Sequence, residues 1–309
     1  MLGGSLMIAG LVELLINHQR TKTYVFALLL ALGIGQQFFN ANIFRRDWQG
    51  QQDIYWQFAW RMPALQPDTA VITQQMPLDY ETDLSMTAAL NWIYTQQIHP
   101  PVLPYALIYS EKRLGGSVLP DLKPDSAITL PYRTVTFNGS NSQAIVIYVP
   151  RDGCLRVLDP ALGDTETYAK FPESLTAPIV ISDPSRIITT ASVPAMPDPP
   201  FNQEPAHAWC YYYEKAELAR QVRDWNQVIA LGLEAEQKGL APRDALERLP
   251  FIEADARTGA WKQAEATARL ALKEDPKTQR GLCQLWKRVL ADDPNEPVPT
   301  LMREFNCGK

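Results

Sequence analysis

Hydrophobic residues are concentrated near the start of the chain. The segment Tyr24–Phe39 reads YVFALLLALGIGQQFF and carries no charged residue. It is about as long as the shortest bilayer-spanning helices, which need ~17 to 25 largely apolar residues. The pattern therefore predicts a transmembrane helix, and the more polar composition of the remaining chain predicts a soluble part anchored by it.

A second apolar stretch precedes this span. Met1–Ile16 is apolar except for Glu13, and a polar connection with Arg20 and Lys22 follows it. A carboxylate is costly in lipid, so Glu13 should face protein or lie near the end of its helix. A secretory signal peptide is the alternative, but it would need a basic start, which this segment lacks. We expect a helical hairpin over residues 1–44.

An aromatic run, Asp47–Met62, follows the hairpin. Trp48, Tyr55, Trp56 and Ala59 share one helical face. Tryptophan and tyrosine favour the headgroup level of a bilayer, which predicts an interfacial helix. The alternative is that these rings form the core of the next domain.

This layout has a counterpart among known proteins. Two membrane spans followed by RRDWQGQQDIYWQFAWRMPALQPDTAVI, within residues 1–110, resemble the membrane exit of polytopic bacterial glycosyltransferases of the GT-C type. The resemblance implies an extracytoplasmic soluble part and a chain that is the tail of a longer protein. In that superfamily the catalytic acidic residue lies in an early loop, so the resemblance assigns no catalytic residue here.

The region 45–191 carries the pattern of a mixed α/β domain. Thr69–Thr73 and Tyr105–Tyr109 read as buried strands, and the amphipathic segment Leu84–Gln96 between them reads as a helix. Two strands joined by a helix predict parallel pairing. The fold class is therefore α/β with an α+β character, because the strand pattern changes further on.

The later strands are short and separated by turn residues. Asn-Gly and Asp-Gly pairs favour tight hairpin turns, so we expect an antiparallel meander, with two further segments as edge strands. The expected strands are Tyr132–Phe137, Ala144–Val149, Leu155–Leu158, Ile179–Ser182 and Arg186–Thr189, with turns at 138–142 and 151–153.

Three carboxylates follow the first of the buried strands. Asp79, Glu81 and Asp83 lie where open α/β sheets tend to bind ligands, and carboxylate oxygens suit a hard cation. The alternative is structural, because Asp83 or Thr82 is placed to cap the following helix. The loop lacks the spacing of a known calcium motif, so we expect a ligand-binding role at most and assign no metal.

Beyond a proline-rich stretch at 192–207, which predicts a stiff linker, the chain becomes helical and repetitive. Trp225 and Trp261 are 36 residues apart, and the closing prolines Pro242 and Pro276 are 34 apart. The order of helix, aromatic turn, helix and proline resembles the tetratricopeptide repeat, whose period is 34. The resemblance covers 208–291 and implies a surface that binds a protein or peptide.

Five aromatic residues are candidates for such an interaction surface: Tyr211, Tyr212, Tyr213, Trp225 and Trp261. The alternative is that the short array packs on the middle domain. We take the helical domain as 208–309.

The net charge and the cysteine pattern argue against two classes of function, nucleic-acid binding and metal binding. The net charge is −5 and the basic residues do not cluster, which argues against a nucleic-acid partner. Four cysteines form no metal-ligand pattern. In an oxidising compartment they allow three pairings, of which Cys283 with Cys307 is the most natural; four reduced thiols are the alternative.

No cofactor motif and no catalytic constellation is present in the sequence. The sequence therefore predicts a cell-membrane protein with an extracytoplasmic interaction or assembly module and no catalysis of its own. Its expected partners are the lipid bilayer and a protein or peptide on the repeats. The alternative is the soluble portion of a membrane glycosyltransferase-like enzyme whose catalytic loop lies upstream.

Overall fold

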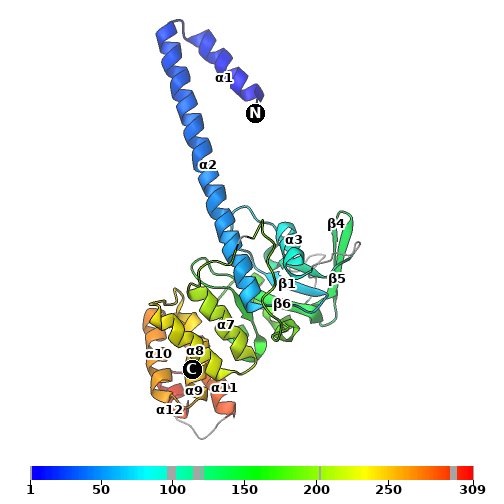
Figure 1. The fold of residues 1–309 in the computed structure, drawn as a ribbon, viewed down its shortest axis with the longest axis vertical. Coiled ribbons are helices and arrows are strands. Elements are labelled where there is room, and N and C mark those ends of the chain that lie inside the picture. The colour runs from blue at the N-terminus through cyan, green and yellow to red at the C-terminus, as the bar shows by residue number, and fades with distance from the viewer. Residues whose placement is uncertain are drawn as a thin grey trace. The chain divides into compact units, whose positions relative to one another are not determined.

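The computed structural model describes residues 2–95, 102–113, 119, 122–201, 203–292 and 298–308. These residues form two compact units, Met1–Gln51 and Gln52–Lys309. The fold is mixed α/β, as the sequence predicts, with a long apolar helix near the N-terminus and a helical C-terminal part (Figure 1).

The first unit consists of α1 (Leu2–Leu15) and most of α2 (Gln19–Arg61). By length and composition α2 could cross a membrane, and its apolar side chains, such as Leu30 and Phe38, are exposed. At ~1.5 Å per residue the 14 residues of α1 reach ~21 Å, less than the ~30 Å of a hydrocarbon core. An ion pair joins Glu13 to Lys22, so the carboxylate that the sequence places among apolar residues has a partner.

The second unit is built around two sheets. The larger has the order β3-β1-β6-β7 and the smaller the order β2-β5-β4. Strand β1 pairs in parallel with both β3 and β6, while β7 runs antiparallel to β6. Their bounds are β1 Thr69–Thr73, β2 Val102–Leu103, β3 Tyr105–Tyr109, β4 Ala127–Tyr132, β5 Val135–Ser140, β6 Ala144–Tyr148 and β7 Arg156–Leu158.

The predicted β-α-β unit is confirmed. Both of its strands match the predicted bounds, and helix α3 (Asp83–Tyr94) lies between them; the predicted helix end at Gln96 lies outside the described residues. Alternate side chains of β1 pack into two different hydrophobic cores, one on each face of the larger sheet. Val71 packs beneath α3 and the end of α2, while Ile72 packs toward the smaller sheet.

Two buried polar side chains of α3 complete the edge of the larger sheet. Asn91 donates through Nδ2 to the Tyr105 carbonyl (2.7 Å) and accepts from its backbone N–H (3.2 Å). Thr87 Oγ1 accepts from the Leu107 N–H (2.9 Å) and donates to its carbonyl. Because β3 is an edge strand, these bonds satisfy backbone groups that no neighbouring strand reaches.

The predicted meander is wrong at its first turn. β4 and β5 form the hairpin, and Arg133, with φ of 52°, lies in its turn. Asn138 and Gly139 lie inside β5, where a Cβ on Gly139 would come 2.6 Å from the Phe137 ring. Glycine is thus needed for a close approach rather than for a turn. Because β6 pairs with β1 and not with β5, the predicted strands also divide between two sheets.

Two further predicted strands are also wrong. The segments 179–182 and 186–189 contain the turns η3 (Ala177–Ile181) and η4 (Pro184–Arg186), with proline near the start of each. Each forms one isolated bridge: Ser182 pairs with Ala144 of β6, and Ile187 pairs with Leu65, which lies before β1. The remaining short elements of this region are η1 Asn141–Gln143, η2 Pro160–Leu162, α4 Ser110–Arg113, α5 Asp164–Thr167 and α6 Glu173–Thr176.

The aromatic run at the end of α2 forms core rather than an interfacial face. Tyr55, Trp56 and Phe58 are buried in the second unit, whereas Trp48 is 40 % exposed. The proline-rich stretch packs against this end of the helix: Trp56 Nε1 donates to the Phe201 carbonyl (3.2 Å), and Phe201 is itself buried. This stretch is therefore a packed segment of one unit rather than a free linker.

The C-terminal part is a stack of helices (Figure 1). Two consecutive helix pairs, α7 with α8 and α9 with α10, are followed by α11 and α12. Their bounds are α7 Trp209–Gln221, α8 Trp225–Gln237, η5 Ala245–Arg248, α9 Leu249–Arg257, α10 Trp261–Glu274, η6 Pro276–Thr278, α11 Gln279–Asp292 and α12 Val298–Glu304. Small residues such as Ala264 and Ala268 are fully buried, which lets neighbouring helices approach closely.

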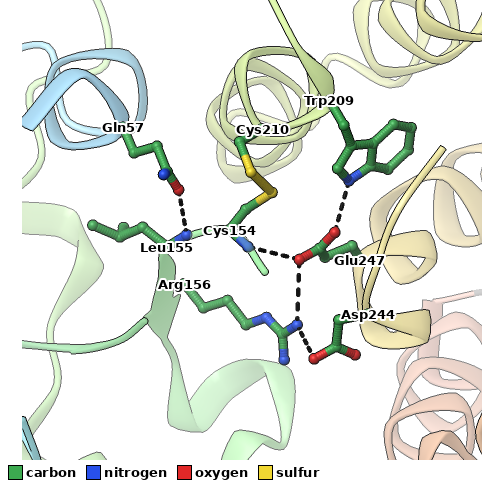
Figure 2. The surroundings of a disulfide bond; sticks show 8 residues. All are labelled: Gln57, Cys154, Leu155, Arg156, Trp209, Cys210, Asp244 and Glu247. Atoms are coloured by element: carbon green, nitrogen blue, oxygen red, sulfur yellow. Dashed lines mark hydrogen bonds and ion pairs between the residues drawn. A yellow bond between two sulfur atoms is a disulfide. The ribbon is translucent and has the colours of Figure 1, made fainter. Parts of the chain in front are cut away.

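The four cysteines form two disulfides. Cys283 pairs with Cys307, as predicted, and Cys154 pairs with Cys210. The first ties the end of the chain to α11. The second joins the loop between β6 and β7 to α7, and so connects the α/β part covalently to the helical part (Figure 2).

We expect Asn91→Ala to reduce the free energy of unfolding by at least about 2 kcal/mol, because it leaves two buried backbone groups of Tyr105 without partners. Chemical denaturation of the purified chain followed by tryptophan fluorescence measures this change. Asn226→Ala, at an exposed position of α8, is the control and should change stability by less than about 0.5 kcal/mol. Equal stability of the two variants would contradict the role assigned to Asn91.

Candidate functional site

The most highly charged cavity of the described residues lies in the second unit. It has a volume of about 340 Å³ and opens between α7, α9, α11 and the segment after β7. We call it the arginine cleft. Its charged lining residues are Arg61, Asp159, Glu217, Arg220, Arg223, Glu253, Arg257, Arg288 and Asp292.

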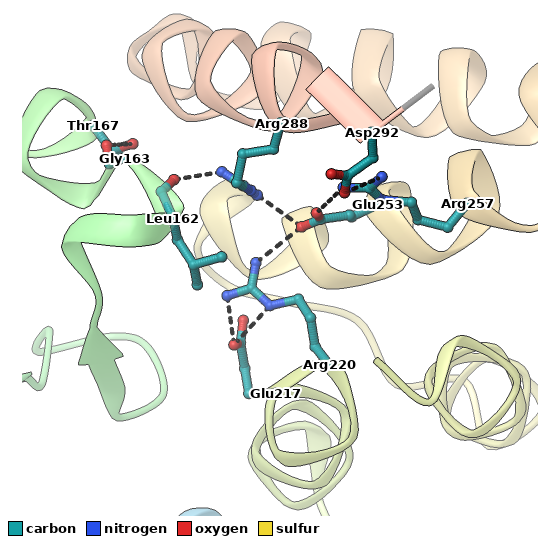
Figure 3. Close-up of polar contacts among 9 residues, drawn as sticks. All are labelled: Leu162, Gly163, Thr167, Glu217, Arg220, Glu253, Arg257, Arg288 and Asp292. Atoms are coloured by element: carbon teal, nitrogen blue, oxygen red, sulfur yellow. Dashed lines mark hydrogen bonds and ion pairs between the residues drawn. The ribbon is translucent and has the colours of Figure 1, made fainter. Parts of the chain in front are cut away.

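Glu253 of α9 is the hub of this cleft (Figure 3). Its carboxylate is 3 % exposed and lies 2.7 Å from Arg288 Nη2, 3.4 Å from Arg220 Nη1 and 3.5 Å from Arg257 Nη2. Burial alone would raise the pKa of Glu253, but the three guanidinium groups outweigh it, so its pKa lies below the ordinary value. One carboxylate thus holds together arginines from α7, α9 and α11.

The outer arginine contacts join the helices to the α/β part. Arg220 binds Glu217 through two nitrogens, at 3.1 and 2.7 Å. Arg288 Nη1 donates to the carbonyl of Leu162, in η2. The helical stack therefore meets the segment after β7 through a charged hydrogen bond of Arg288, in addition to the apolar packing of Leu246.

A second charged cluster surrounds the Cys154–Cys210 disulfide (Figure 2). Glu247 is fully buried; it accepts a bond from the Cys154 N–H (2.7 Å) and another from Trp209 Nε1 (2.7 Å). Burial raises the pKa of Glu247 despite the nearby Arg156. Arg156 Nη2 lies 2.5 Å from Asp244. Every charged group here has a protein partner, so this cluster serves cohesion.

The predicted carboxylate site is not assembled as a cation site. Asp79 is exposed, and Glu81 accepts a 2.5 Å bond from Ser85 Oγ. Thr82 caps α3, with a reciprocal bond to Ser85, so the structural alternative explains the neighbourhood of Asp83. Among the residues that the structure describes, no group of three or more histidine, cysteine or carboxylate side chains is placed to hold a metal ion.

The five predicted surface aromatics take different positions. Tyr212 and Tyr213 are buried and offer no surface. Tyr211 is half-buried, stacked on His207 at 3.5 Å, and Trp261 packs against the core of α9 to α12. Trp225 lines the arginine cleft, with Arg257 over its ring at 5.8 Å. Of the five, Trp225 is thus the one that reaches a candidate site.

A groove lined by both apolar and polar side chains lies on another face of the helical stack. Its volume is about 570 Å³, and it runs between α8, α9 and α10. Leu233 and Leu270 line it and are 52 % and 43 % exposed. Its other apolar lining includes Trp209, Ile229, Leu240 and Phe251. We call it the leucine groove; large exposed leucines at one place are a feature of binding surfaces.

The arginine cleft was missed in the sequence because its members are scattered over several elements. A signal was available: Glu217 and Glu253 are 36 residues apart, the same spacing as Trp225 and Trp261. Each of these glutamates is followed one helical turn later by an arginine, Arg220 or Arg257. This pattern indicates that the two repeats present charged residues on the same face. Arg61 and Arg288 have no such periodic signal.

Comparison with protein-family models, with curated proteins and with solved structures found no match to this chain. The function therefore has to be argued from the geometry above.

We expect Glu253→Gln to reduce the free energy of unfolding by about 3–5 kcal/mol at pH 7, because it leaves buried guanidinium groups without their shared carboxylate. The lowered pKa of Glu253 means that its stabilisation is present above the ordinary glutamate value of 4.5 and is lost as the pH falls through the native pKa. The difference between wild type and variant should therefore shrink toward pH 3. Denaturation at several pH values measures it.

Asp292→Asn is the matched control. Asp292 pairs with Arg257 at 2.8 Å but is 52 % exposed, so its loss should cost less than about 1 kcal/mol. A Glu253→Gln variant no less stable than this control would contradict the hub assignment.

Proposed function

We propose that this protein is a membrane-anchored, extracytoplasmic module for interaction or assembly, without catalysis of its own in these residues. The anchor is the apolar part of α2, the partners are the bilayer and a protein or peptide, and the partner binds the helical stack.

The observation that carries the anchoring is the composition of α2. Its apolar part, including Leu30 and Phe38, is exposed, while the end of the same helix places Tyr55 and Phe58 in the core of the second unit. A helix that is apolar all round over one part and is not covered by protein suits lipid. A helix that also belongs to a folded core makes a firm anchor, since it cannot be lost without unfolding that core.

The two disulfides support an extracytoplasmic position for the second unit. Disulfides persist in oxidising compartments and are rare in a reducing cytosol. Cys154–Cys210 and Cys283–Cys307 account for every cysteine of the chain. Both lie in the second unit, which we therefore assign to the outer side.

The leucine groove is the surface that we assign to the partner. The faces of α7, α9 and α11 that line the arginine cleft lie against the chain's own segment after β7. The groove between α8 and α10 keeps Leu233 and Leu270 exposed. Apolar side chains of a protein or peptide segment would bury these leucines. Each Å² of apolar surface removed from water would stabilise the complex by ~25 cal/mol.

The assigned side of the membrane can be tested on intact cells with a membrane-impermeant amine reagent. Lys170 and Lys273 are exposed residues of the second unit, and we expect mass spectrometry to find both modified without lysis. Lys22, in the first turn of α2, is the internal control and should become modified only after lysis. Labelling of Lys22 alone in intact cells would reverse the assigned orientation.

Leu233→Glu combined with Leu270→Glu should abolish assembly through the leucine groove, because two carboxylates would have to be buried against apolar side chains. Native gel electrophoresis of mildly solubilised membranes measures the size of the complex. Leu84→Glu, at a leucine of α3 that is 49 % exposed, is the control and should leave the complex intact. A complex unchanged by the double variant would contradict the groove as partner surface.

A further inference from the structure

Arg61 is a buried cation of the arginine cleft. It is the last residue of α2, it is 4 % exposed and it lines the cleft. Its Nη1 donates to Gln221 Oε1 at 3.0 Å. Within the described part of the chain, no carboxylate forms an ion pair with it. A guanidinium remains charged at neutral pH, so this position holds an uncompensated positive charge.

The carboxyl groups near Arg61 do not compensate it. Glu217 is bound by Arg220 at 2.7 Å. Glu214 is fully buried, and neither of its oxygens has a hydrogen-bond partner among the described residues. Burial raises the pKa of Glu214 well above its ordinary value, against the opposing effect of Arg61. Among the described residues, neither carboxyl group forms an ion pair with Arg61: Glu217 pairs with Arg220, and Glu214 pairs with no cation.

A second arginine, which forms no ion pair with the described residues, lies at the mouth of the cleft. Arg223 is exposed, lines the cleft, and follows α7 with φ of 60°. The other lining arginines, Arg220, Arg257 and Arg288, are paired with carboxylates. Five arginines and four carboxylates line the cleft, so its formal charge is +1.

The space between them is large enough for a ligand. A volume of about 340 Å³ exceeds by roughly tenfold the ~30 Å³ that one water occupies in the liquid. Guanidinium groups bind phosphate and carboxylate oxygens through paired N–H donors, and such bonds are about twice as strong as neutral ones. Trp225 offers an apolar wall beside this charge.

We propose that the arginine cleft binds a small anionic ligand through a phosphate or carboxylate group, which pairs with Arg61 inside the cleft and with Arg223 at its mouth. Acidic lining residues, among them Asp159, accept hydrogen bonds from hydroxyl or amino groups of the same ligand. The site is independent of the membrane anchor and of the leucine groove.

The experiment follows thermal unfolding of the full chain in detergent during titration with inorganic phosphate or with acetate, at an ionic strength held constant with sodium chloride. We expect a saturable rise of Tm with at least one of the two anions, because a ligand that binds only the folded state stabilises it. A response to phosphate alone assigns a phosphoryl ligand, and a response to acetate alone a carboxylate.

Two variants test the assigned residues. Without added anion, Arg61→Met should be at least as stable as wild type, because an isolated buried charge is costly, and it should lose the anion response. Arg223→Ala changes an exposed residue and should retain the fold, while its apparent affinity falls about tenfold, the loss expected for one charged hydrogen bond.

Arg269→Ala is the matched control. Arg269 is an exposed residue of α10, half accessible and bound to Glu265 and Glu304, so its removal should leave the anion response unchanged. Absence of any saturable response in wild type, or an Arg223→Ala response equal to that of wild type, would overturn the proposal. If Arg61→Met does not fold, the comparison of Arg223→Ala with Arg269→Ala decides.

Discussion

The second unit depends on burial of the end of α2. Tyr55, Phe58 and Met62 pack beneath the larger sheet, and the opposite side of the same turns presents Trp56 and Trp60 to the proline-rich stretch and to α7. One short helical segment is thus in contact with the sheet, the connecting segment and the helical stack. Large aromatic side chains bury the most area per residue, which explains why so few residues can join three parts of the fold.

Local sequence patterns predict those helices and strands whose conformation is determined by residues a few positions apart. The strand Thr69–Thr73 agrees with the structure, because apolar periodicity acts within a few positions. Trp225 and Trp261, which the sequence places in turns, are the first residues of α8 and α10. The turn predicted at Asn138-Gly139 is wrong, because here the glycine allows the Phe137 ring to approach the backbone closely. The aromatic run was ambiguous, because rings suited to a bilayer interface are equally suited to a protein core.

The arginine cleft could not be predicted because its chemistry is distributed over long separations. Arg61, Arg220 and Arg288 come from α2, α7 and α11, and only tertiary packing brings them together. The sequence also does not show which arginines are paired. Glu253 forms ion pairs with three of them, so the number of charged residues along the chain does not give the net charge of the cleft. The predicted carboxylates at 79–83, which are close in sequence, surround the cap of α3.

The position of Arg61 follows from the role of α2 in the core. The helix ends at this residue, the aromatic residues just before it are buried on both sides of the helix, and Arg61 itself is buried. The free energy gained by burying those rings therefore offsets the cost of burying the Arg61 guanidinium. Arg61 is thus a buried charge that no carboxylate of the described residues pairs with, and an anion entering the cleft would supply that partner.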